Sequence, residues 1–168
     1  MEYRRLGKSG LRVSELSYGS WVTFSFQLDK AKAKKTMKHA YDAGINFFDN
    51  AEVYAAGESE KIMGAALKEL GLQRDTYTVS SKVFFGGQLV TQRGLNAKHI
   101  RDGCDAALKR LKLDYIDLLF WHRPDFHTPV EETGRARDIL VKLGKILYWG
   151  TSEGPADRIR EAYIIAYK

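Results

Sequence analysis

Residues 45–60 read INFFDNAEVYAAGESE, a stretch that carries both a strand signal and a chemical signal. The run INFFDNA (45–51) contains aromatic and β-branched residues and ends at polar ones, which is typical of a buried strand. Asp49 stands near the end of that strand, and Tyr54 follows five positions later in the next loop. Apolar strands commonly end at a turn residue, so the rest of the chain decides what this pair means.

The same strand pattern recurs along the chain. Four further runs combine aromatic or β-branched residues with polar or small ends: LSYGSW (16–21), TYTVSSK (76–82), DYIDLLFWH (114–122) and ILYWGTS (146–152). Amphipathic segments separate these runs. The clearest is 97–111, where one helical face would hold Ile100, Cys104, Ala107, Leu108 and Leu111. Asn96 is expected to cap that helix, and Thr128 and Glu131 are expected to form a capping box at the start of the next one.

Five strand–helix units that recur roughly every 30 to 38 residues predict an α/β protein with a parallel sheet. One candidate is a doubly wound open sheet, which usually has a glycine-rich phosphate loop after its first strand. Here residues 19–23 read GSWVT, with no such motif. The other candidate is a (β/α)₈ barrel of which about five units are present. It predicts reactive side chains at the carboxyl ends of several strands.

Composition favours a folded, soluble protein over a disordered one. Of the 168 residues, 44% are hydrophobic and 29% are charged, and no apolar run approaches the roughly 20 residues that cross a bilayer. The first ten residues, MEYRRLGKSG, have no signal-peptide core. The single cysteine, Cys104, fits a reducing compartment, so we expect a cytoplasmic protein without membrane insertion and without a metal site.

The net charge of +6 leaves three interpretations open: a nucleic-acid partner, a phosphate-bearing cofactor, or solubility alone. Its densest source is DKAKAKKTMKH (29–39). At helical spacing Ala33, Met37 and Tyr41 form one stripe, so we interpret the lysines as a solvated helix face. No nucleic-acid-binding motif accompanies them, and we expect no nucleic-acid partner.

Three predicted strands end at residues whose chemistry is complementary. The second ends at Asp49 with Tyr54 beyond it, the third at Lys82 and the fourth at His122. Each alone could be structural: a turn cap, a half-buried aromatic, a surface charge or a core histidine. Together they are informative, because the carboxyl ends of barrel strands meet at one rim.

These groups suit the reduction of a carbonyl compound. A free phenol has a pKa near 10 and is a reluctant proton donor, but an adjacent ammonium stabilises the phenolate. A carboxylate would hold that ammonium in place, and a histidine N–H could orient a carbonyl oxygen. None of the four side chains is redox active, so a nicotinamide cofactor is the expected source of hydride.

The chain resembles the aldo-keto reductase superfamily, and within it the branch of potassium-channel β subunits and their prokaryotic relatives. The resemblance is carried, in family order, by YRRLGKSGLRVSELSYGSW, YDAGINFFDNAEVYAAGESE, RGLNAKHI, HRPDFHTPVEET and YWGTS. It implies a TIM-type barrel that uses NADPH to reduce a small aldehyde or ketone. Residues 1–15 would form an N-terminal hairpin, and residues 16–168 the βα units of one partial domain.

The resemblance also implies residue roles. Tyr54 matches the general acid, Lys82 and Asp49 the pair that tunes it, and His122 the residue that orients the carbonyl. On the cofactor side, the matching positions are Ser20, Trp21, Gln27, Asp49 and Ser152.

Two departures from the branch bear on function. Channel β subunits carry asparagine where this chain has His122, which favours an enzyme over a purely regulatory protein. Ser152 is followed by Glu153 where the branch has arginine, and a carboxylate cannot make the arginine's contact with an anionic cofactor.

A complete barrel needs eight βα units and about 250 residues, so we expect an N-terminal portion of a longer protein. The segment ADRIREAYIIAYK (156–168) keeps helical periodicity to its end. We therefore expect cofactor binding and activity to be impaired, and association through open sheet edges or a homo-oligomer. The alternatives are a channel-β-type regulatory protein and an inactive truncated product.

Overall fold

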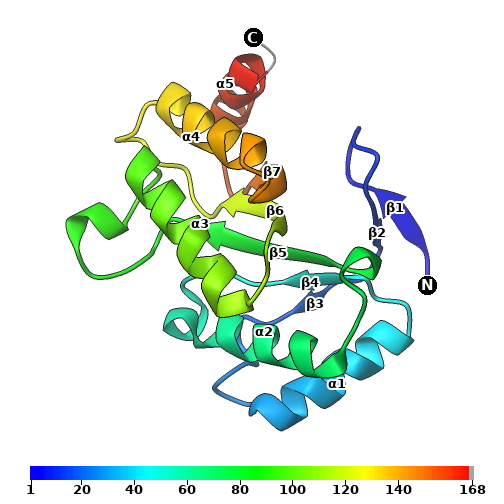
Figure 1. Ribbon diagram of the computed structural model, residues 1–168. Coiled ribbons are helices and arrows are strands. Elements are labelled where there is room, and N and C mark those ends of the chain that lie inside the picture. Colours follow the sequence, from blue (N-terminus) through cyan, green and yellow to red (C-terminus); the bar gives the residue numbers. More distant parts are fainter. Residues whose placement is uncertain (167–168) are drawn as a thin grey trace.

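The computed structural model describes residues 1–166, which form a short hairpin and a parallel α/β layer (Figure 1). The hairpin consists of β1 (Tyr3–Arg5) and β2 (Arg12–Ser14). The parallel sheet follows chain order: β3 (Tyr18–Gly19), β4 (Phe47–Asp49), β5 (Thr78–Val83), β6 (Ile116–Trp121) and β7 (Ile146–Thr151). This order confirms the expected α/β architecture.

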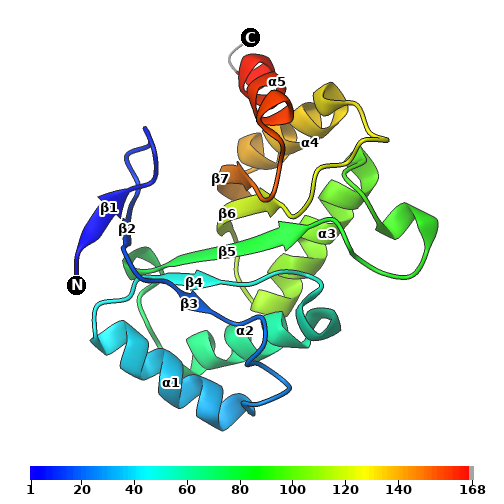
Figure 2. The same cartoon turned by 180° about the vertical axis from the view of Figure 1, so that it is seen from behind.

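An α-helix follows each parallel strand, as βα units require. They are α1 (Lys30–Asp42), α2 (Glu58–Leu70), α3 (Ala97–Leu111), α4 (Val130–Lys142) and α5 (Ala156–Ala166). Three short 3₁₀ segments lie in the connections: η1 (Tyr54–Gly57), η2 (Arg74–Thr76) and η3 (Val90–Gln92). Viewed from both sides, the helices lie along one face of the sheet (Figures 1 and 2). Five successive βα units in chain order are the arrangement of a partial (β/α)₈ barrel. Residues 167–168 of the predicted last helix lie outside the described part.

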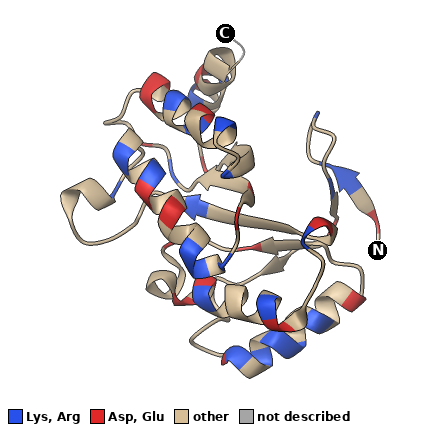
Figure 3. Cartoon of the chain, in the orientation of Figure 1, with Lys and Arg blue, Asp and Glu red and all other residues tan. Residues whose placement is uncertain are grey.

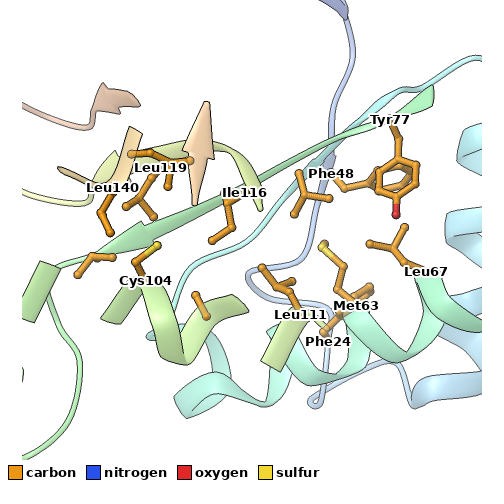
Figure 4. Close-up of a cluster of buried hydrophobic side chains, with 14 of the residues drawn as sticks. Phe24, Phe48, Met63, Leu67, Tyr77, Cys104, Leu111, Ile116, Leu119 and Leu140 are labelled. Atoms are coloured by element: carbon orange, nitrogen blue, oxygen red, sulfur yellow. The ribbon is translucent and has the colours of Figure 1, made fainter. Parts of the chain in front are cut away.

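The main core fills the space between the sheet and its helices (Figure 4). Strand alternation sends Phe48, Val79 and Leu119 toward the helices, where they are at least 96% buried. Cys104 is part of this layer, as its helical position predicted, and burial raises the pKa of its thiol to about 12. It is therefore a core residue rather than a reactive thiol.

The hairpin is hydrogen-bonded to the segment just before β4. The Ser14 amide donates to the Asn46 side chain at 2.7 Å, and the Tyr3 hydroxyl donates to the Gly44 carbonyl at 2.8 Å. Both acceptors lie just before β4, so the hairpin sits where the strands begin. The carboxyl ends of the strands are left for the loops that carry chemistry.

Helix caps follow the predictions in one case and not in another. The Asn96 side chain accepts from the His99 amide at 2.9 Å, which confirms the cap of α3. The predicted capping box at Thr128 and Glu131 is wrong. Pro129 is the N-cap of α4 and makes no side-chain cap bond, while the Thr128 hydroxyl bonds the Asp125 carboxylate at 2.8 Å.

Positions of Lys and Arg and positions of Asp and Glu are interspersed along the helices (Figure 3). On α1 Ala33 and Met37 are fully buried, and the helix turns lysines such as Lys32 and Lys38 to the surface. The lysine-rich segment is therefore a solvated helix face, as its periodicity predicted. No helix within residues 1–166 is both long and apolar enough to cross a membrane.

Candidate active site

The Lys82 ammonium is the centre of a hydrogen-bonded group at the carboxyl end of the sheet. Its Nζ lies 2.6 Å from Asp49 Oδ2, 2.8 Å from the Asn50 carbonyl oxygen and 3.1 Å from the Tyr54 hydroxyl. These contacts bring together three of the four side chains that the strand ends predicted. The Lys82 side chain is 11% exposed and that of Asp49 26% exposed, so water screens the pair only partly.

Strand register explains how Asp49 is placed. In the parallel pair of β4 and β5, Asp49 lies opposite Ser80, whose hydroxyl donates to Asp49 Oδ1 at 2.5 Å. The Ser20 hydroxyl donates to the Asp49 carbonyl at 2.9 Å from the neighbouring β3 end. Ser80 and Lys82, both in β5, therefore donate to the two oxygens of the Asp49 carboxylate and fix its position.

Tyr54 is held by an unusual turn. Ala55 and Ala56, directly after it, both have left-handed backbone conformations, with φ of 50° and 52°. Left-handed geometry costs roughly 1–2 kcal/mol for each residue with a Cβ. The turn leads directly into α2 and leaves Tyr54 only 8% exposed, with its hydroxyl on Lys82. The sequence Ala-Ala gave no signal for such a turn.

His122 lies across the site from Tyr54. The two rings meet edge to face with centroids 5.8 Å apart, and the Phe85 ring also packs edge to face on His122, with centroids 5.2 Å apart. Burial, followed by the charges of Lys82 and Arg123, lowers the pKa of His122 to about 4. The imidazole is therefore neutral near pH 7 and has one N–H to donate.

His122 predicts a dependence of stability on pH. Its pKa is about 4 in the folded chain and near 6.5 in an unfolded one, so between these values the unfolded chain binds more protons. The free energy of unfolding should fall as the pH is lowered through this interval, by at most about 1.4 kcal/mol per pH unit. Urea unfolding at several pH values measures the slope.

His122→Asn should remove this part of the slope, whereas His127→Asn should retain it, because His127 is exposed. A slope that is the same in the wild type and in His122→Asn would contradict the neutral, buried histidine.

An open cavity of about 360 Å³ joins these groups. Its walls come from the carboxyl ends of all five parallel strands and the loops after them, namely Trp21, Val53, Tyr54, Lys82, Phe85, His122, Arg123, Ser152 and Glu153. The Trp21 ring stacks on Tyr54 at 6.1 Å and remains 67% exposed. Of the residues predicted on the cofactor side, Trp21 and Ser152 line the cavity.

The other predicted cofactor residues are placed differently. Asp49 does not line the cavity but is bonded to Lys82, which does. Ser20 is fully buried, and its hydroxyl donates to the Asp49 carbonyl in β4. Gln27 is exposed in the loop before α1 and is not part of the cavity wall. Glu153 pairs with Arg123 at 3.1 Å.

Several wall residues were not predicted from sequence. Phe85 and Arg123 come from the loops after β5 and β6, and neither stands at a strand end. Ser80 could have been found, since it stands two residues before Lys82 and alternation places both on one face.

The fold and site define a class: a partial (β/α)₈ barrel with a carboxylate, a phenol, an ammonium and a neutral imidazole at its carboxyl rim. A profile of the aldo/keto reductase family matches residues 15–167. The chain is 54% identical over 166 residues to a probable voltage-gated potassium channel subunit beta of Oryza sativa subsp. japonica. It is 53% identical over 163 residues to a protein of the same description from Arabidopsis thaliana.

These matches cover 99% and 97% of the chain but 51% and 50% of the relatives, so the chain spans about half their length. It belongs to the aldo/keto reductase family, which confirms the resemblance that the motifs indicated.

Proposed function

We propose that the site reduces a small aldehyde or ketone to an alcohol, with Tyr54 as proton donor and a nicotinamide cofactor as reductant. The contact of Lys82 with both Asp49 and Tyr54 carries this proposal. An ammonium held by a carboxylate supports negative charge on the phenol oxygen after the proton has left. Tyr54, Lys82 and His122 line one cavity within residues 1–166, and Asp49 is bonded to Lys82.

The cavity fits a nicotinamide group and a carbonyl compound. The exposed Trp21 ring offers an apolar face, and Ser152, also in the cavity wall, offers a hydroxyl. His122 Nδ1 is buried and has no hydrogen-bond partner among the described residues, as expected of a side chain that gains its partner from a bound molecule. When bound, the cofactor supplies hydride to the carbonyl carbon.

The residues of the chain then have separate tasks. The neutral His122 donates a hydrogen bond to the carbonyl oxygen and orients it. As negative charge develops on that oxygen, the Tyr54 hydroxyl transfers its proton to it. The Lys82 ammonium stabilises the resulting phenolate, and Asp49 holds Lys82 in place. The choice of NADPH over NADH rests on the family resemblance.

A regulatory role is the second candidate, because both plant relatives are described as probable channel β subunits. In that case the barrel would bind cofactor while serving as a partner of a potassium channel. His122 favours the enzyme, since it supplies an N–H to a carbonyl oxygen. A chain that binds NADPH but never oxidises it in the presence of aldehydes would favour the regulator.

The test compares the chain with a chimera in which the unmatched part of the rice relative follows Lys168. Both are mixed with NADPH and an aromatic aldehyde, and the loss of cofactor absorbance is followed. We expect turnover in the chimera and weak or absent turnover in the chain. Turnover in neither, with Tyr54→Phe identical to the parent, would contradict the reductase proposal.

Association through the sheet edges is a separate proposal. Among residues 1–166, β3 and β7 each pair on one side only, and exposed edges invite pairing with another chain. Leu147 in β7 is 47% exposed. Sedimentation should show self-association of the chain, and a cooperatively unfolding monomer would contradict it.

A further inference from the structure

Glu52 stands in the loop between Asp49 and Tyr54, but its side chain turns toward α3. Its Oε1 accepts from the Phe84 amide at 2.6 Å and from the Gly86 amide at 2.9 Å, and it lies 3.2 Å from His99 Nε2. The Glu52 side chain is 4% exposed. One carboxylate oxygen therefore joins the loop after β4, the loop after β5 and helix α3.

The surroundings are shaped for this buried carboxylate. Burial alone would raise the pKa of Glu52, but the bonds from His99, Phe84 and Gly86 outweigh it and lower the pKa. Gly103 gives the space inside α3, since a Cβ there would lie 3.2 Å from Glu52 Oε2 and 2.9 Å from Val83 Cγ1. A glycine within a helix costs roughly 0.5–1 kcal/mol relative to alanine, so its presence here fits the need for room.

The two bonded amides flank Phe85. With Phe84 and Gly86 both fixed, the Phe85 backbone between them has little freedom. Its ring packs edge to face on His122, at 81° between ring planes, and forms a wall of the cavity. The Glu52 amide also donates to the Lys82 carbonyl at 3.2 Å, which ties the same residue to β5. Glu52 does not line the cavity, but it is bonded to the two residues that flank Phe85 and to the backbone of Lys82.

We propose that Glu52 is a positioning residue of this site: by holding the amides of Phe84 and Gly86, it fixes the Phe85 ring as the cover of His122. The inference rests on the proposed function, since covering His122 matters because that side chain orients the carbonyl. A loosened cover would admit water beside the imidazole and weaken the effect of burial.

The test is the titration of His122 followed by NMR, with its ring signal assigned by its loss in His122→Asn. The charged or titratable groups that face His122 are Lys82, Arg123, Asp49, Glu52 and Tyr54. The Glu52 charge itself raises the pKa of His122, so removing only that charge should lower it. Loss of the Phe85 cover should act in the opposite direction.

Glu52→Ala is therefore expected to raise the pKa of His122 by about one unit or more, from about 4 toward the ordinary value near 6.5. Glu52→Gln keeps an oxygen acceptor for both amides and should leave the pKa unchanged or slightly lower. Phe85→Ala should reproduce the rise, because it removes the cover directly. Should Glu52→Ala be recovered unfolded, Glu52→Asp replaces it, since the shorter side chain cannot reach both amides.

Glu60→Gln is the matched control. Glu60 is also a fully buried carboxylate, but it bonds Ser81 and Arg110 instead of the loop that carries Phe85. It should leave the His122 titration unchanged. An unchanged or lower pKa in Glu52→Ala would overturn the proposal, as would an equal rise in Glu60→Gln. Because the titration needs no turnover, a positive result together with an inactive chimera would refute the proposed reaction and leave the positioning intact.

Discussion

Replacing Tyr54 with phenylalanine is expected to lower kcat for aldehyde reduction by about 10²- to 10⁴-fold, the usual contribution of a positioned general acid. The Tyr54 hydroxyl is the group that lies 3.1 Å from Lys82 Nζ, and phenylalanine leaves its ring and the stacked Trp21 in place. The affinity for NADPH, measured by fluorescence titration, should change little. Steady-state kinetics on the chimera described above measures kcat.

Tyr41→Phe is the control for this substitution. It also removes one hydroxyl, which donates to Thr76 at 2.8 Å in a part of the molecule remote from the cavity. Its kcat should match that of the parent. If Tyr54→Phe kept kcat within about twofold of the parent, the proton would have to come from another group and the proposed role of Tyr54 would be wrong.

Replacing Lys82 with methionine should lower kcat by a similar factor and also lower the free energy of unfolding. The substitution leaves Asp49 facing Ser80 with its ammonium partner gone, and a lost hydrogen bond to a charged group costs about 1.5–3 kcal/mol. We expect the free energy of unfolding, measured in urea, to fall by roughly this amount.

The double variant Lys82→Met/Asp49→Asn separates the two effects. It removes the unpaired carboxylate, so part of the lost stability should return while activity stays absent. Lys145→Met breaks a more exposed pair with Asp105 and should cost less than about 1 kcal/mol. A double variant that is less stable than Lys82→Met would show that Asp49 is not held chiefly by its pairing with Lys82.

Much of the fold could be predicted because burial and periodicity act locally. The helix predicted at 97–111 has those bounds, since its apolar stripe and the Asn96 cap agree. The first strand run was expected over 16–21 but forms only Tyr18–Gly19, because backbone pairing with β4 covers just these residues. The failed cap at Thr128 has a long-range cause: Asp125 accepts from its hydroxyl and from the Leu95 amide at 2.8 Å.

The site was predictable to the extent that strand ends converge. Asp49 ends β4, Lys82 is next to the end of β5 and His122 directly follows β6. A parallel sheet brings such positions to one rim whatever the loops do. The residues of the cavity wall were harder to predict from the sequence, because Phe85 and Arg123 lie in loops whose path depends on distant contacts. Glu52 was missed because nothing local shows that its carboxylate turns away from Tyr54 to bond Phe84 and Gly86.

In the proposed reaction, one carbonyl group receives a hydride from the cofactor and the proton of Tyr54. The most direct measurement uses NADPH doubly deuterated at nicotinamide C4, an aromatic aldehyde and the chimera, with mass spectrometry of the alcohol. We expect one deuterium on the carbinol carbon of the product, and loss of that product in Tyr54→Phe. An alcohol without deuterium, or an unchanged yield in Tyr54→Phe, would contradict it.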